Sequence, residues 1–145
     1  MTDSFDAIPI ADRLEIEALL ARQSHLVDES DAEAWADTFT TDGVFESPTY
    51  QLVARGPVEL AEFARTSNDR ARSQGRQFRH VVSSIWLTAE TPDRIRSRQY
   101  VMIHITDAEG TRVDRSLVVS DLLLRTQNGW RVQHRTMRRD GIPQG

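Results

Sequence analysis

The second half of the chain consists of long stretches with the alternation of β-strands, separated by short turn sequences. Val101, Ile103 and Ile105 alternate with Tyr100 and Met102, so this segment has two different faces. The intervening residues 91–93, 107–110 and 127–129 include the Pro, Gly, Asp and Asn that favour tight turns. We therefore expect an antiparallel sheet whose four long strands cover residues 78–88, 95–106, 112–125 and 130–138.

The first half of the chain has the patterns of helices. Residues 11–29 carry apolar side chains at helical spacing, and residues 30–33 (Ser-Asp-Ala-Glu) form a capping-box pattern that starts a short second helix through Phe39. Short extended pieces follow around residues 44–46 and 51–53, and Gly56-Pro57 opens a third helix that Gly75 ends. Helices followed by an antiparallel sheet predict an α+β domain.

Length and composition exclude several classes of protein. The 145 residues fit a single domain, 1–145, with an ordered core of about residues 9–140 and short flexible tails. The chain has no cysteine, and its 18 basic residues are all arginine, which excludes disulfides, thiolate nucleophiles, Schiff bases and a P-loop. A net charge of -4 argues against a nucleic-acid partner. Without a signal peptide or an apolar span of ~20 residues, we expect a cytoplasmic protein and no membrane partner.

The sequence contains no pattern for a metal or a nucleotide cofactor. Its four histidines are His25, His80, His104 and His134, and none of them shows the short spacing of metal ligands. Gly-rich phosphate loops and the Gly-x-Ser-x-Gly elbow of serine hydrolases are also missing from the sequence. We therefore expect chemistry that needs neither a metal nor a cofactor.

Asp28 and His80 are the residues that best fit a proton-transfer pair. Asp28 follows Leu20 and Ser24 at helical spacing, so the three share one edge of the first helix. An inward carboxylate is costly without a hydrogen-bond donor, and a histidine oriented by a carboxylate is a base near neutral pH. The strand face that begins at His80 continues through three residues that suit a pocket or a plain core: Val82, Ser84 and Trp86.

The order of these elements and motifs resembles the SnoaL-like proteins of the cone-shaped nuclear transport factor two-like superfamily. The resemblance covers roughly residues 11–140. It rests on Asp28 at the end of the first helix, Trp35, residues 39–45 (Phe-Thr-Thr-Asp-Gly-Val-Phe), Arg79-His80 and residues 128–132 (Asn-Gly-Trp-Arg-Val). It implies a curved antiparallel sheet wrapped around the helices, a deep apolar pocket, and homo-oligomers, dimers or trimers, that associate through the sheet.

The resemblance also implies roles for individual residues. In scytalone dehydratase-like and hexachlorocyclohexane dehydrochlorinase-like enzymes an Asp–His dyad lies in the pocket, and Asp28 and His80 match its positions. Dehydratases add pocket tyrosines and a second histidine, for which Tyr50, Tyr100 and His104 are available here. Dehydrochlorinase-like enzymes add an arginine, to which Arg125 is the nearest match, although its sequence context fits a surface residue equally well. The residues that we expect to bind substrate are Trp35, Tyr50, Ser84, Trp86, Tyr100, Met102 and Arg125. The cluster Arg135, Arg138 and Arg139 suits the binding of a substrate carboxylate, but the pattern favours a solvated surface.

These observations lead to three functional hypotheses. The first is a cofactor-free lyase or isomerase, of the dehydratase or cyclase type, in which His80 removes a proton from a small, largely apolar cyclic metabolite and Asp28 orients the ring. The second is a domain that binds such a metabolite without chemistry. The third is a structural subunit resembling the small subunit of ring-hydroxylating dioxygenases.

Overall fold

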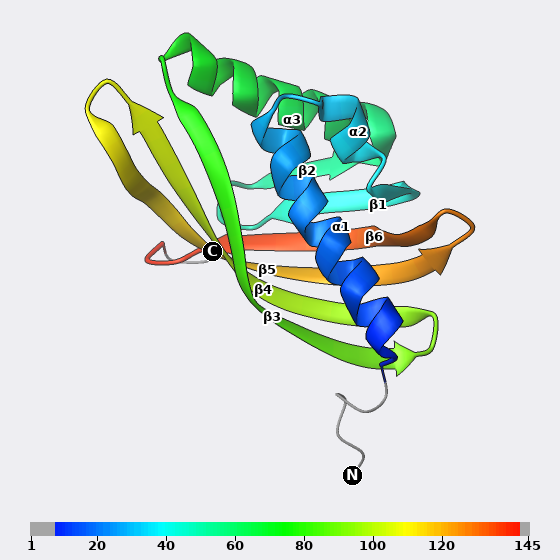
Figure 1. Ribbon diagram of the computed structural model, residues 1–145. Helices are drawn as coiled ribbons and strands as arrows, with labels where there is room; N and C mark the ends of the chain where they lie inside the picture. The colour runs from blue at the N-terminus through cyan, green and yellow to red at the C-terminus, as the bar shows by residue number, and fades with distance from the viewer. Residues whose placement is uncertain (1–7, 143–145) are drawn as a thin grey trace.

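The computed structural model describes residues 8–142, in which three helices pack against one six-stranded sheet (Figure 1). The elements in chain order are α1 (Ile10–Asp28), α2 (Ala32–Ala36), β1 (Phe39–Ser47), β2 (Leu52–Arg55), α3 (Gly56–Ser73), β3 (Gln77–Thr91), β4 (Arg94–Asp107), β5 (Gly110–Thr126) and β6 (Gly129–Arg139). The expected α+β architecture is confirmed.

The sheet is mixed, which corrects the expectation of a purely antiparallel one. Its strand order is β2-β1-β6-β5-β4-β3, and the β1–β6 pair is parallel while the others are antiparallel. The reason is that β6, the last strand in the chain, does not extend the sheet at its edge but inserts between β1 and β5. The four expected strands lie within β3 to β6, which are longer because pairing continues into the turns, as between Asp107 and Gly110.

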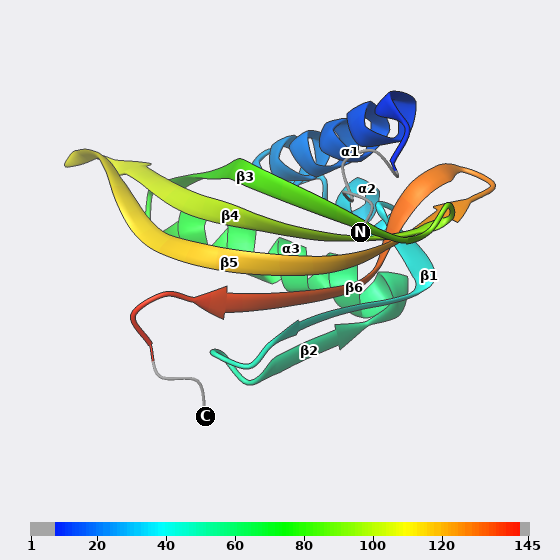
Figure 2. The ribbon, with the colours of Figure 1, turned by 90° about the horizontal axis from the view of Figure 1, so that it is seen from below.

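All three helices lie on one face of the curved sheet (Figure 2). Helix α1 runs obliquely across the strands, and its buried residues Ile16, Leu19 and Leu20 belong to the main hydrophobic core (Figure 1). The second helix is shorter than expected, because β1 already begins at Phe39. Its N-cap is Asp31, whose Oδ1 accepts a hydrogen bond from the Ala34 N–H, and Ser30 instead adopts a left-handed turn with φ 66°.

Irregularities in strand pairing interrupt the alternation of side chains, and three of them bear on the site described below. In β3 the pairing with β4 skips between Ser83 and Trp86, and Ser84 has a positive φ of 53°. In β5 the register shift leaves Asp114 unpaired, and in β6 a shift lies at Gln133. Because an extra residue in a strand moves all later side chains to the opposite face, each bulge decides which residues face the helices.

The helix-facing side of the sheet contains two clusters of buried apolar residues. The larger cluster lies between the helices and the sheet and includes Trp35, Phe45 and Trp130. The smaller one consists of four residues on the middle strands, Val101, Ile103, Leu117 and Val119. The functional site described below lies where these two clusters meet.

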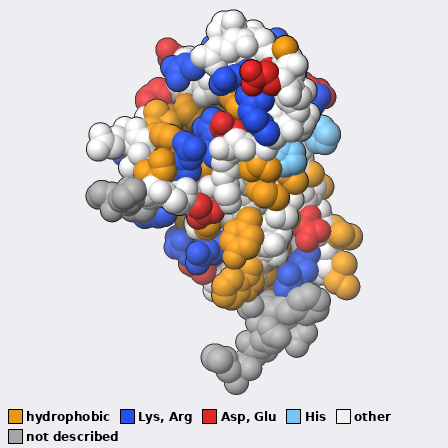
Figure 3. Space-filling view, turned by 90° about the vertical axis from the view of Figure 1, so that its left-hand side faces the viewer, with side chains coloured by type: hydrophobic (Ala, Val, Ile, Leu, Met, Phe, Trp, Pro, Cys, Tyr) orange, Lys and Arg blue, Asp and Glu red, His pale blue; other side chains and the backbone are white. Residues whose placement is uncertain are grey.

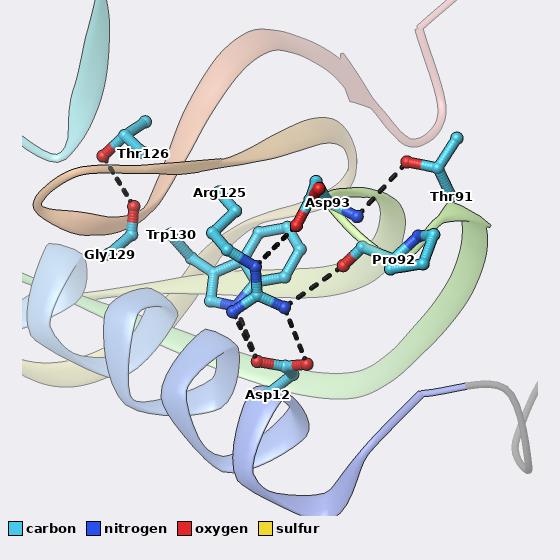
Figure 4. A network of polar contacts seen from close by, with 8 residues as sticks. All are labelled: Asp12, Thr91, Pro92, Asp93, Arg125, Thr126, Gly129 and Trp130. Atoms are coloured by element: carbon cyan, nitrogen blue, oxygen red, sulfur yellow. Dashed lines mark hydrogen bonds and ion pairs between the residues drawn. The ribbon is translucent and has the colours of Figure 1, made fainter.

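Arg125 joins the beginning of α1 to two hairpins of the sheet (Figure 4). Its Nη1 and Nη2 donate to both carboxylate oxygens of Asp12 at 3.0 Å, and its Nε donates to Asp93 at 2.8 Å. The guanidinium also lies over the ring of Trp130, 4.7 Å from the centroid, and the indole N–H of Trp130 donates to Asp12. Hydrogen bonding by Arg125 holds the pKa of Asp12 below its ordinary value.

The predicted flexible tails lie mostly outside the described residues. Within residues 8–142 no helix is long and apolar enough to cross a membrane.

The Asp12–Arg125 contact yields a prediction about stability and pH. A carboxyl group with a lowered folded-state pKa stabilises the fold above its unfolded-state pKa of about 3.9, and this stabilisation is lost as the pH falls through the folded-state value. Asp12→Asn should therefore lower the free energy of unfolding by about 1.5–3 kcal/mol at pH 7. Urea denaturation should show that the difference in unfolding free energy between Asp12→Asn and the wild type becomes smaller as the pH is lowered from 7 to 3.

Asp93→Asn is the matched control for this prediction. Asp93 binds the same arginine through a single hydrogen bond, and its side chain is 73% exposed, so the loss should be smaller. A destabilisation by Asp12→Asn that stays constant from pH 7 to pH 3 would contradict the role assigned to the ionised carboxylate.

Candidate functional site

Asp28 and His80 lie within hydrogen-bond distance of each other. The Nδ1 of His80 is 2.6 Å from Oδ1 of Asp28, and the second oxygen, Oδ2, accepts the backbone N–H of His80 at 3.0 Å. The Asp28 side chain is only 5% exposed, whereas that of His80 is 26% exposed. One buried carboxylate therefore binds both the ring and the backbone of the histidine, which fixes the orientation of the imidazole.

The end of α1 is held against the sheet by two further contacts. The Nε2 of Gln77, the first residue of β3, donates to the backbone carbonyl of Asp28 at 3.2 Å. The side-chain amide of Asn68, on α3, donates to the backbone carbonyl of Val27. Carbonyl groups in the last turn of a helix have no partner within the helix, so these amides satisfy them and also position Asp28.

A cavity of about 140 Å³ lies beside the imidazole of His80. It is enclosed by α1, α2, α3 and the helix-facing side of strands β1 and β3 to β6. Its walls are mostly apolar: Leu20, Val27, Trp35, Phe45, Phe63, Ala64, Phe78, Val82, Val101, Ile103, Leu117, Val119 and Met137. This volume matches a cavity that accepts a single benzene-sized ring.

A buried polar network borders the same cavity. Arg135 donates to both carboxylate oxygens of Asp121, from Nε at 2.7 Å and from Nη2 at 2.8 Å, and to Oε1 of Gln23 at 2.7 Å. Gln99 donates to Asp121 at 2.9 Å and accepts from the Ser97 hydroxyl. The side chain of Asp121 is fully buried, so its charge is balanced inside the protein by Arg135.

Arg135 keeps one donor group for a ligand. Among the described residues no hydrogen-bond partner is found for its Nη1, although Nε and Nη2 are both engaged. Arg135, Gln99 and Gln23 all line the cavity together with His80. The site therefore combines an oriented imidazole with hydrogen-bond donors on a separate wall.

The structure brings only part of the predicted site together. Trp35 and His80 line the cavity, and Asp28 lies behind His80. The other six residues that we expected to bind substrate lie outside the cavity: Tyr50, Ser84, Trp86, Tyr100, Met102 and Arg125.

Each of these six has a physical reason for its position. Because of the bulge in β3, Ser84 and Trp86 do not continue the face of His80, and the Trp86 side chain is 66% exposed. Tyr100 and Met102 belong to the outward face of β4, whereas Val101 and Ile103 are buried on the other face of the same strand. Tyr50 lies in the turn between β1 and β2 and lines the neighbouring hollow instead of this cavity, and Arg125 binds Asp12 at the beginning of α1.

Arg135 and Gln99 are the site residues that sequence reasoning missed. Arg135 was interpreted as part of a solvated surface with Arg138 and Arg139, but the bulge at Gln133 turns it toward the helices. Gln99 shares the inward face of β4 with Val101 and Ile103, so the strand alternation was the available signal. Within residues 8–142, no group of three or more His, Asp or Glu side chains is arranged to hold a metal ion.

The Arg135–Asp121 pair predicts an effect that depends on the partner residue. Arg135→Met leaves a buried carboxylate without its cation, which should cost about 3–5 kcal/mol of unfolding free energy. The double variant Arg135→Met/Asp121→Leu removes both charges and should be more stable than the single variant in urea denaturation. A double variant that is less stable than Arg135→Met would show that the unpaired charge of Asp121 is not the main cause of the destabilisation by Arg135→Met.

Comparisons with known proteins show the same fold. Aln2 from a Streptomyces species has 26% identity and a TM-score of 0.81, with 92% of this chain and 94% of that chain covered. An NTF2-like protein with a cystatin-like fold, from Novosphingobium aromaticivorans, has 25% identity, a TM-score of 0.81 and coverages of 91% and 84%. A Catenulispora acidiphila structure in complex with S-DNPA has 28% identity, a TM-score of 0.77 and coverages of 91% and 96%.

The family is established by sequence as well as by structure. No curated protein gives a significant match to the chain. The model of the SnoaL-like domain family matches residues 9–136, which include Asp28, His80 and Arg135. The chain therefore belongs to the SnoaL-like domain family.

Proposed function

We propose that the protein is a cofactor-free enzyme that removes a proton from carbon in a small, largely apolar cyclic metabolite, as a lyase or isomerase of the dehydratase or cyclase type. The observation that carries the proposal is the Asp28–His80 hydrogen bond of 2.6 Å at the wall of an apolar cavity. A histidine that only stabilised the fold would not need an open cavity beside its ring.

The tautomer of His80 follows from its partner. An ionised carboxylate only accepts hydrogen bonds, so Nδ1 carries the hydrogen that Asp28 accepts. Nε2 then carries a lone pair and acts as the base. Asp28 orients the ring and stabilises the imidazolium that forms when Nε2 takes a proton from the substrate.

Proton removal leaves an electron pair that the site must stabilise. When the carbon lies next to a carbonyl group, the pair moves onto the carbonyl oxygen and an enolate forms. The Nη1 group of Arg135 is the donor that we assign to this oxygen, because the other guanidinium nitrogens are held by Asp121 and Gln23. The enolate then expels a leaving group, as in a lyase, or regains the proton at another carbon, as in an isomerase.

The relatives are consistent with a small-molecule ligand. The Catenulispora acidiphila structure was obtained in complex with S-DNPA. The chain is similar to that protein over 91% of its length, and its cavity is lined mainly by apolar side chains. The proposal for this chain rests on its own Asp28–His80 geometry.

Proton abstraction can be tested before the physiological substrate is known. Single-ring cyclic ketones fit the cavity, and ¹H NMR follows the exchange of their α-hydrogens for solvent deuterium. The wild-type protein should accelerate this exchange for at least one ketone of a panel. His80→Ala and Asp28→Asn should each slow the enzymatic exchange by on the order of 100-fold or more.

His104→Ala is the control for this experiment. His104 lies on β4, next to β3, and is not among the residues that line the cavity, so its removal should leave the exchange rate unchanged. Exchange that is equally fast in wild type and His80→Ala would exclude His80 as the base. Tight binding of a ketone without any exchange would favour the second hypothesis, a binding domain that uses the same cavity.

We further propose that copies of the chain associate through the outer face of the sheet, as the family resemblance implies. Four apolar side chains of β3 and β4 are exposed there: Val81 (38%), Trp86 (66%), Tyr100 (51%) and Met102 (37%). Val81 pairs directly with Met102, so the exposed side chains are neighbours across the two strands. Exposed apolar groups gathered on one face are typical of an interaction surface.

Trp86→Ser should weaken this association. Sedimentation velocity should show a shift from the wild-type homo-oligomer, a dimer or trimer, toward the 16.5 kDa monomer. Val58→Ser is the matched control, because Val58 is also exposed (78%) but lies on α3, away from this face. An unchanged mass distribution for Trp86→Ser would argue against the outer face as the interface.

A further inference from the structure

The cavity beside His80 adjoins a second hollow. This outer chamber has a volume of about 530 Å³ and shares four lining residues with the cavity: Phe63, Ser67, Arg115 and Met137. The inner cavity, at about 140 Å³, matches the size of one benzene-like ring. A larger metabolite whose ring reaches His80 has space for its remaining atoms in the adjoining outer chamber.

Arg115 lies at the junction of the two chambers. The strand register places His80 opposite Ile103 and Ile103 opposite Arg115, so these residues form one row across β3, β4 and β5. With neighbouring strands about 4.8 Å apart, the backbones of His80 and Arg115 are separated by roughly 10 Å. The guanidinium lies over the ring of Phe78, 5.8 Å from its centroid, and Phe78 also lines the inner cavity.

Arg115 follows the bulge in β5, and only one of its three guanidinium nitrogens has a hydrogen-bond partner among the described residues. Its Nε forms an ion pair at 2.6 Å with the carboxylate of Asp114, the residue that the bulge leaves without a partner in the strand register, so the guanidinium already has one anionic neighbour. Among the described residues no partner is found for its terminal nitrogens, Nη1 and Nη2. Two α3 residues line the outer chamber beside it, Ser67 with a hydroxyl and Arg70 with a second guanidinium.

The charges of the outer chamber are arranged along α3. Glu59 and Glu62 lie near the beginning of the helix, whereas Arg70 lies near its end and close in sequence to Ser67, which is shared by both chambers. The two glutamates repel an anion at the beginning of α3, and Arg70 attracts it near the end of the helix. Figure 3 shows the left-hand side of the view in Figure 1, where hydrophobic, arginine and acidic side chains lie beside one another on the surface.

We propose that Arg115, with Arg70 and Ser67, forms an anion-binding subsite that holds a carboxylate of the substrate while its ring occupies the cavity beside His80. The terminal nitrogens of Arg115 match the two oxygens of a carboxylate, and the apolar walls match the ring. This inference builds on the proposed function and defines its substrate class as cyclic metabolites with an acidic side arm.

Binding of two matched probes tests the subsite without any turnover. The probes are 3-phenylpropanoate and 3-phenylpropanamide, which share one ring and one arm and differ in charge. Isothermal titration calorimetry at low salt should show that the wild-type protein binds the acid about tenfold more tightly than the amide. Arg115→Met should abolish the preference for the acid and leave amide binding unchanged. The control is Arg72→Met, because Arg72 is an exposed arginine of α3 that does not line either chamber; this variant should retain the preference.

The outcomes separate this inference from the proposed function. His80→Ala should retain the preference for the acid even though it loses proton exchange, which would show that the subsite and the base act independently. Equal binding of the two probes to the wild type, no binding of the acid, or an undiminished preference in Arg115→Met would overturn the subsite and leave the role of His80 intact. Loss of the subsite preference in Arg115→Met together with normal exchange in His80→Ala would support the subsite and exclude the base.

Discussion

The Asp28 carboxylate connects the helix layer to the sheet beside the cavity. Its two oxygens bind the ring and the backbone N–H of His80, so one contact stabilises the end of α1 and orients the imidazole. A carboxylate that is 5% exposed needs these donors, and the histidine needs the carboxylate to fix its tautomer. The packing of α1 against the sheet and the proposed proton transfer therefore depend on the same pair of side chains.

The cavity results from incomplete coverage of a curved sheet. Helix α1 crosses the strands obliquely, and the main core fills the space around it, but the middle strands extend beyond this core. The space left over is bordered by apolar side chains and by the Arg135–Asp121–Gln99 network. The charges of this network are balanced within the protein, so the polar wall adds hydrogen-bond donors without leaving a buried charge unpaired.

Much of the fold could be predicted from the sequence, because strand alternation and helix periodicity are local signals. The same signals placed Asp28 on an inward edge of α1 and His80 on an inward strand face. The prediction was wrong for Trp86 and for Arg135, because each follows a bulge, at Ser84 and at Gln133, that moves later side chains to the other face. Nothing in the residues alone marks where a ladder of hydrogen bonds will skip.

The position of β6 has a consequence for how the protein folds. This strand comes last in the chain yet lies between β1 and β5, so it joins the β1–β2 pair to strands β3 to β5. Its contacts with β1 link residues about 90 positions apart, as between Thr136 and Glu46. Pairing between strands that are so far apart in the sequence is slow. During synthesis on the ribosome, the wall of the cavity beside His80 stays incomplete until its β6 residues, Arg135 and Met137, have emerged. The nascent chain therefore exposes the apolar faces of β3 to β5 from their synthesis until β6 has been made, a period in which binding by chaperones would protect it from aggregation.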